Sequence, residues 1–192
     1  LADAPPARLF DETMKLFMNG RALDSFHLLE AQGLLERLFP ATAKALAGPN
    51  GAQFRALVEG MLASTDARVR EDKPVTPAFL FAALLWEPVR QAAQAAIDGG
   101  SEASTAWSNA AARVLREQVG RVAIPRRFTL ATEEIWALQP RFSQRTKKRA
   151  LRLLSHPRFR AAYDFLLLRA GESAELAELG TWWTHAQEVP PE

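Results

Sequence analysis

Cysteine is absent from the 192 residues, which excludes disulfide bonds and metal sites built on thiolates. The three histidines, His27, His156 and His185, are scattered, and their spacing does not match that of metal ligands. The longest apolar run, Ala78 to Trp86, is far too short to span a bilayer. Because no basic region followed by an apolar one opens the chain, we expect no secretory signal and a cytoplasmic location.

Motifs for nucleotide and acyl-transfer chemistry are missing as well. No two aspartates form an Asp-x-Asp pair, which a metal-dependent nucleotidyl-transfer site would need. The adjacent Glu133 and Glu134 lie at a predicted helix start, where they would complement the helix dipole. Gly99-Gly100-Ser101 lacks the Lys-Ser/Thr of a phosphate-binding loop, and no Gly-x-Ser-x-Gly elbow occurs. The sequence therefore offers no catalytic residue and no metal ligand.

Valine and isoleucine are sparse, and no segment alternates apolar and polar residues between turn signals. Almost every segment has helical periodicity instead, so we predict an all-α fold, an irregular bundle of about ten helices without a sheet. One predicted helix carries a complete apolar stripe, formed by Phe54, Leu57, Val58, Met61 and Leu62. Another is capped by Thr76-Pro77, and because residues 78–86 are apolar all round, it should be the buried centre of the core.

Proline, glycine and capping residues predict where the helices begin and end. A short third helix, residues 34–39, should end at Pro40, and a charged connector should run over residues 65–73. Glu87-Pro88 should break the apolar helix. Later helices should start at Ser101 or Ser104, at Thr129 or Thr132, and at Ser173.

Positive charge is concentrated in one part of the chain. The net charge is only +2, yet residues 121–160 hold eleven Lys or Arg against two Glu, a net of +9, and the rest sums to −7. A basic lobe on an acidic body favours a polyanionic partner. We expect a helical body domain over residues 1–120, a basic extension packed on it over residues 121–188, and a frayed tail at residues 189–192.

The densest charge lies between Arg141 and Arg160, a stretch with eight Lys or Arg and no acidic residue. At about 100° per residue, its apolar and basic side chains fall on opposite sides of a helix. The apolar stripe would be Ala150, Leu151, Leu153 and Leu154, and the basic stripe Arg145, Lys148, Arg149 and Arg152. Lys147 falls on the apolar side and must extend its ammonium outward. Pro157 should end this helix and open the next one.

A basic helix face is often merely solvated, and this reading fits most isolated charge runs. Here, four cations on one face without an interleaved Glu repel each other, which a merely solvated face would avoid. Arginine also dominates, and its guanidinium binds phosphate oxygens bidentately. We therefore predict a polyanion-binding surface formed by Arg126, Arg127, Arg141, Arg145, Lys147, Lys148, Arg149, Arg152 and Arg158.

The tryptophans offer a second kind of contact. Adjacent Trp182 and Trp183 could stack on nucleic-acid bases, but Leu179 on the same helix indicates that at least one of them lies in the core. The apolar stripes of other helices should bury the remaining tryptophans, Trp86, Trp107 and Trp136.

Several stretches resemble the helical body of bacterial poly(A) polymerases, class II nucleotidyltransferases that are related to the CCA-adding enzymes. In the first half of the chain these are Arg8-Leu9-Phe10-Asp11-Glu12, Gly33-Leu34-Leu35 and Pro74-Val75-Thr76-Pro77-Ala78. The strongest match is Ile124-Pro125-Arg126-Arg127, Ile135-Trp136-x-Leu138-Gln139, Lys148-Arg149-Ala150 and His156-Pro157-Arg158-Phe159-Arg160. This basic end is similar to the poly(A) polymerase type specifically, because CCA-adding enzymes usually lack it.

The resemblance implies that the polyanion is RNA, a single-stranded 3′ end held through its phosphates. The family adds AMP from ATP to RNA 3′ ends with magnesium, in mRNA polyadenylation, processing and decay. Its catalytic head carries a metal-binding Asp pair that this sequence lacks, so we expect the head, with its ATP and magnesium sites, to lie before Leu1. These 192 residues would bind and position RNA without catalysing the reaction, and would need no cofactor of their own.

Two other interpretations stay open at this point. The chain could be the body of a CCA-adding enzyme, which a preference for folded tRNA over unstructured RNA would support. It could also be a non-enzymatic helical module whose basic face docks an acidic protein, which the charge distribution alone fits equally well. Competition between single-stranded RNA and an acidic protein separates this last interpretation from RNA binding.

Overall fold

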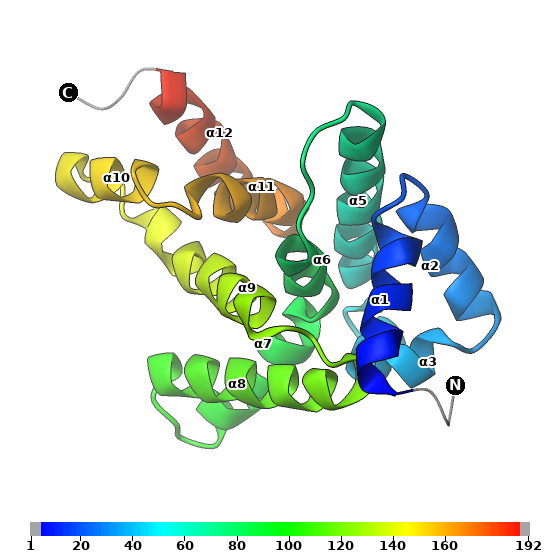
Figure 1. Cartoon of the computed structure of the whole chain (residues 1–192). Coiled ribbons are helices and arrows are strands. Elements are labelled where there is room, and N and C mark those ends of the chain that lie inside the picture. Colours follow the sequence, from blue (N-terminus) through cyan, green and yellow to red (C-terminus); the bar gives the residue numbers. More distant parts are fainter. Residues whose placement is uncertain (1–4, 189–192) are drawn as a thin grey trace. The chain divides into compact units, whose positions relative to one another are not determined.

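A computed structural model describes residues 5–188, and the tail predicted at residues 189–192 lies outside that range. Within it, all regular structure is helical, with twelve α-helices and two short 3-10 helices (Figure 1). The predicted all-α fold is confirmed. One helix that was not expected is α4 (Pro40–Leu46), because Pro40 does not merely follow α3 (Leu35–Leu38) but occupies the first position of the next helix. None of the described helices could cross a membrane.

The chain forms two compact units, one reaching Thr129 and the other starting at Leu130. Besides α3 and α4, the first unit contains α1 (Pro6–Phe17), α2 (Ala22–Ala31), α5 (Gly51–Arg70), α6 (Pro77–Leu84), α7 (Trp86–Asp98) and α8 (Ala103–Val122). Within it, α7 packs against α8, α1 against α8, and α2 against α5 (Figure 1). Helix α9 (Arg126–Leu138) begins in the first unit and continues into the second.

The core of the first unit is built around α6, as its apolar sequence predicts. The Thr76 hydroxyl accepts a hydrogen bond from the amide of Ala78, and Pro77 takes the first helical position. Residues 80–84 are buried on every side of this helix. The Phe81 ring lies 6.4 Å from that of Phe10 and 6.3 Å from that of Phe39. The predicted apolar stripe of α5 is buried as well.

Residues 65–70 do not form the predicted charged connector, because α5 continues to Arg70. Asp66, in this part of α5, is only 8% exposed. Its carboxylate accepts hydrogen bonds from the amides of Ala22 (2.6 Å) and Leu23 (3.1 Å), the first two residues of α2. The first amides of a helix have no partner within that helix, so Asp66 caps α2 from a different helix.

Three further helix boundaries differ from the prediction. The break after α6 falls at Leu85 rather than at Glu87-Pro88, since proline is tolerated in the first turn of α7. Glu102, not Ser101 or Ser104, caps α8, and its carboxylate accepts the amide hydrogens of Ser104 and Thr105. Neither Thr129 nor Thr132 caps α9, because that helix already starts at Arg126.

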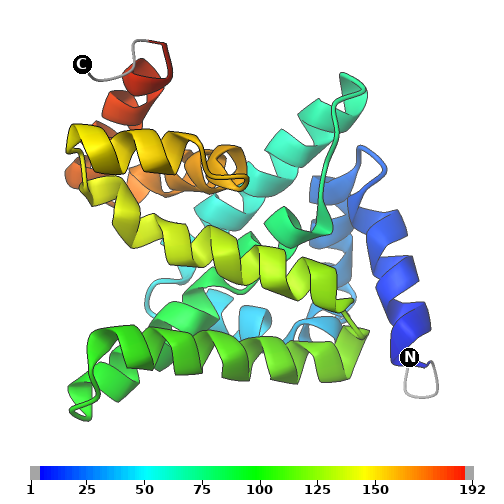
Figure 2. The ribbon, with the colours of Figure 1, turned by 60° about the vertical axis from the view of Figure 1, so that its left-hand side comes forward.

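The second unit continues from α9 through a 3-10 helix, η1 (Gln139–Ser143), α10 (Lys147–Leu154), α11 (Phe159–Arg169), a second 3-10 helix, η2 (Ala170–Glu172), and α12 (Ala174–Glu188). Helix α11 packs against α12 (Figure 2). Trp183 is fully buried at the centre of this unit's core, and its Nε1 donates a hydrogen bond to the carbonyl of Phe142 (2.8 Å). The predicted cap at Ser173 is confirmed, since its hydroxyl accepts from the amide of Leu176 (3.2 Å).

Candidate nucleic-acid interface

The basic stretch forms a shorter helix than its charge pattern predicted. Helix α10 begins at Lys147, so Arg145 precedes it and does not lie on the helical face where the sequence placed it. Helix α10 buries Ala150 and Leu153 against the core of the second unit, and Leu154 is half-buried. Leu151 was assigned to the apolar stripe but is 42% exposed. The apolar face of α10 is therefore narrower than the predicted four-residue stripe, because Leu151 does not belong to it.

The turn after α10 also differs from the prediction. Helix α10 ends at Leu154, and α11 starts at Phe159 rather than at Pro157, which lies in the turn between them. His156 stabilises this turn, because its Nδ1 accepts a hydrogen bond from the amide of Arg158 (3.0 Å). His156 is therefore a structural residue of this turn.

The first turn of α10 consists of Lys147, Lys148 and Arg149 and has no acidic residue. Cations at a helix N-terminus lie against the positive end of the helix dipole, which is the unfavourable orientation. Unpaired amides and three cationic side chains here all favour a negatively charged ligand. This arrangement is unfavourable for the helix alone and becomes less unfavourable when an anion lies at its N-terminus.

The basic residues of the second unit divide into two groups by their ion pairs. Four are held by carboxylates: Arg145 by Glu178 (2.7 Å), Arg158 by Glu134 (2.7 Å), Arg160 by Asp164 (3.0 Å) and Arg169 by Glu172 (3.2 Å). The others are exposed and form no ion pair with any residue that the structure describes: Arg141, Lys147, Lys148, Arg149 and Arg152. Five cations are thus available to a polyanion without breaking an internal contact.

The two remaining predicted site residues, Arg126 and Arg127, belong to the first unit, where they open α9. Both are exposed. The guanidinium of Arg127 lies 4.6 Å from the centre of the Phe128 ring, and this ring stacks on Phe10 at 6.0 Å. Arg127 is therefore positioned by an aromatic contact and forms no ion pair with a carboxylate of residues 5–188.

The structure also decides which tryptophans are core residues. Trp86, Trp136 and Trp183 are at most 5% exposed, as predicted. Trp107 is half-buried and stacks on Trp86 at 5.3 Å. Trp182 is half-buried too, and packs against the core of the second unit next to Trp183.

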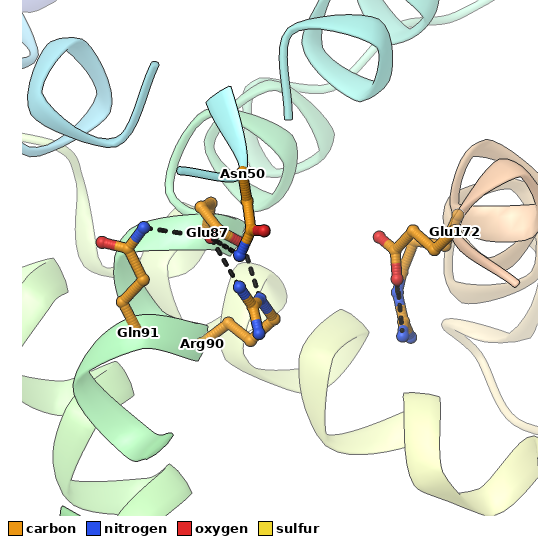
Figure 3. Close-up of polar contacts among 6 residues, drawn as sticks. Asn50, Glu87, Arg90, Gln91 and Glu172 are labelled. Carbon is orange, nitrogen blue, oxygen red and sulfur yellow. Dashed lines mark hydrogen bonds and ion pairs between the residues drawn. The ribbon is translucent and has the colours of Figure 1, made fainter. Parts of the chain in front are cut away.

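One buried carboxylate in the first unit needs an explanation, because buried acids often mark active sites. Figure 3 shows Asn50, Arg90 and Gln91 converging on Glu87, which is 4% exposed. Arg90 donates to it at 2.6 and 2.7 Å, Gln91 at 3.0 Å and Asn50 at 3.2 Å. Burial raises the pKa of the Glu87 carboxyl, but these hydrogen bonds outweigh burial and lower the pKa overall. Glu87 is thus a satisfied structural carboxylate that links α7 to the start of α5.

Glu172, also drawn in Figure 3, belongs to the second unit, where Arg169 donates to it at 3.2 Å. Between residues 5 and 188, no group of three or more His, Cys, Asp or Glu side chains could hold a metal ion.

Fold and surface together define an all-helical protein with an exposed, arginine-rich face. Comparison with known families places it further: residues 99–192 match the arginine-rich C-terminus of polymerase A, and residues 1–46 match its probable RNA and SrmB-binding site. The chain belongs to the bacterial poly(A) polymerase family and corresponds to its C-terminal part.

Curated relatives agree over the whole chain. Poly(A) polymerase I of Escherichia coli O157:H7 is 42% identical and that of Salmonella typhi 40% identical, each over 100% of this chain. Poly(A) polymerase I of Haemophilus influenzae is 38% identical over 97% of it. The chain spans 42% of the length of these relatives.

The family match over residues 1–46 names a binding site where the sequence analysis predicted none. The basic residues there are Arg8, Lys15, Arg21, Arg37 and Lys44, and the acidic ones are Asp3, Asp11, Glu12, Asp24, Glu30 and Glu36. Five basic residues against six acidic ones leave no excess of positive charge that would indicate RNA binding. Only the resemblance of Arg8 to Glu12 and of Gly33 to Leu35 to the family pointed to this segment.

Proposed function

We propose that this chain binds RNA through its backbone phosphates and positions RNA ends for a polynucleotide adenylyltransferase. The observation that carries the proposal is the set of five exposed cations on and beside α10 that no carboxylate holds. The names of the relatives and the description of the family segment at residues 1–46 support RNA as the ligand.

Contacts to phosphates rather than to base edges suit an enzyme that must accept many different RNA ends. Phosphate contacts fix the position of a strand but carry no sequence information. Arg149 and Arg152 can grip phosphates bidentately, whereas Lys147 and Lys148 act as point charges. We expect salt-sensitive binding with little sequence preference.

In the whole protein we propose transfer of AMP from ATP to RNA 3′ ends. The reaction's ATP and magnesium would be bound by the catalytic head that the resemblance to the family implies. We therefore assign no chemical step to the side chains of this chain. Their contribution is to hold the RNA strand, in the processing and decay of mRNA.

The proposal is tested with two oligomers of the same base sequence. The chain should bind oligo(A) RNA and should bind a neutral peptide-backbone analogue much more weakly, because that analogue has no phosphates. A fluorescence-anisotropy titration at low salt measures both affinities. Equal affinity for the two oligomers would overturn phosphate binding as the function of this surface.

A second role is favoured for residues 1–46, because the family description there names SrmB beside RNA. We propose that this segment of the first unit also docks a protein. A comparison of two binding measurements tests it. A variant with Arg145, Lys148, Arg149 and Arg152 all changed to Ala should lose RNA binding in the second unit and keep SrmB binding. Loss of both together would contradict separate sites.

A further inference from the structure

Trp182 lies one turn of α12 away from Glu178, the residue that binds Arg145. Glu178 and Trp182 are four residues apart on α12, and side chains at this spacing lie on one face of a helix. The carboxylate of Glu178 is held by Arg145 at 2.7 Å. Arg145 therefore reaches the face of α12 that also carries Trp182.

Packing fixes the position of the Trp182 ring. It meets Trp183 at a centroid distance of 4.8 Å and an interplanar angle of 78°, an edge-to-face arrangement. Trp183 is itself fully buried and bonded to the carbonyl of Phe142, the residue after Arg141. The Trp182 ring is thus held by the core of the second unit, while part of its surface stays exposed.

From this arrangement we infer that Trp182 is a stacking platform for an unpaired nucleobase. The inference rests on the proposed RNA binding and deepens it, because it adds a base contact to phosphate contacts. Arg145 would grip a phosphate next to the stacked base, after releasing Glu178. Stacking on an indole suits a sequence-tolerant protein, since every base has a π-face.

Trp107 provides a matched control. It is the other half-buried tryptophan of the described residues, but the first unit holds it and its ring already stacks on Trp86 at 5.3 Å. The residues three and four positions away from it on α8 are all uncharged: Ala103, Ser104, Ala110 and Ala111. Trp107 has no cation on its own helix face that could hold a phosphate beside a base.

The test compares oligo(A) with an abasic oligomer of the same length and charge, on wild type, Trp182→Ala, Trp182→Phe and Trp107→Ala. Trp182→Ala should lower the affinity for oligo(A) about fivefold or more and leave that for the abasic oligomer unchanged. Trp182→Phe keeps a ring and should retain most of the affinity, and Trp107→Ala should change neither affinity. The far-ultraviolet circular dichroism and melting temperature of each variant show whether it is folded.

Three outcomes overturn the inference. If Trp182→Ala binds oligo(A) as wild type does, Trp182 makes no base contact although the chain binds RNA. If Trp182→Ala weakens oligo(A) and abasic binding equally, its effect is structural, and the phenylalanine variant should then fail as well. If wild type binds neither oligomer, the proposed RNA binding fails and the inference fails with it.

Discussion

The guanidinium of Arg145 lies 2.7 Å from the carboxylate of Glu178, so a residue predicted to bind phosphate is already held by an acid. Both side chains are exposed, Arg145 at 38% and Glu178 at 67%. Exposed ion pairs contribute little to stability, typically below about 1 kcal/mol. A phosphate can therefore replace this carboxylate at small cost, and Glu178 should act as a weak competitor of RNA.

Changing Glu178 to Gln should raise the affinity for oligo(A) by about two- to fivefold at low salt. Gln keeps the shape of the Glu178 side chain but has no charge, so it no longer holds Arg145 in an ion pair. The melting temperature should stay nearly the same. Glu175→Gln is the matched control, since it removes the same charge from α12 but breaks no ion pair among the described residues. An equal gain in both variants would mean that only the overall charge matters.

A trade-off between stability and binding is expected in the first turn of α10. Arg149→Glu places an acid three residues after Thr146, which would create a capping box and complement the helix dipole. It should stabilise the protein by about 0.3–1 kcal/mol and yet weaken RNA binding. Thermal unfolding and RNA titration measure the two effects.

Arg152→Glu is the control for this trade-off, because it puts the same charge in the last turn of α10. It should weaken RNA binding without any gain in stability, since an acid opposes the dipole there. A gain in melting temperature in both variants would show that mere relief of repulsion among the cations explains the result.

Asp66 should be a large contributor to the stability of the first unit. Asp66→Ala leaves the amides of Ala22 and Leu23 without their acceptor, and Ala22 is fully buried. An unsatisfied buried amide costs about 1–3 kcal/mol, so urea unfolding should show a loss of at least about 2 kcal/mol. Asp11→Ala, at an exposed position on α1, should stay within about 0.5 kcal/mol of wild type.

Glu102 gives a pH-dependent prediction. Hydrogen bonds from the amide and hydroxyl of Ser104, and from Thr105, lower the pKa of the Glu102 carboxyl from 4.5 to about 2. A lowered pKa stabilises the folded state above the unfolded pKa, and this stabilisation is lost as the pH falls toward the folded pKa. The difference in melting temperature between wild type and Glu102→Gln should therefore be constant above about pH 5 and shrink from there to about pH 2.

The matched control on α8 is Glu117→Gln, at an exposed position that caps no helix end. Its difference from wild type should lack this shrinkage. A constant difference for Glu102→Gln down to pH 2 would show that the carboxylate does not need its charge to cap the helix.

The all-helical fold and most core stripes were predictable because burial repeats with the helical period, as in α5 and α6. Two of the errors have identifiable causes: one is a contact between residues far apart, and the other is a cap of an unfavoured type. Asp66 reads as part of a charged loop until α2 is placed against it, and Glu102 is an uncommon capping residue. Local patterns do not contain the contacts of Asp66, which join residues 43 and 44 positions apart.

The basic surface was predictable in composition but not in detail. The sequence shows which residues are cationic, and the structure shows them exposed. Whether a cation is free or held depends on carboxylates 24 to 33 residues away, as in Arg158 with Glu134 and Arg145 with Glu178. The exposure of Leu151 likewise depends on which neighbours cover α10.

The most direct test of RNA binding by α10 is the salt dependence of its affinity for oligo(A). For a single strand, the slope of log affinity against log salt concentration is about −0.7 per phosphate contacted. In a variant, the four unpaired cations of α10, Lys147, Lys148, Arg149 and Arg152, are changed to Ala. Its affinity should fall, and its slope should become less negative by about two to three units, because each lost phosphate contact removes about 0.7. A control that changes Arg70, Lys73, Arg113 and Arg116 of the first unit to Ala removes the same charge and should keep the slope. Equal slopes for wild type and the α10 variant would contradict the account.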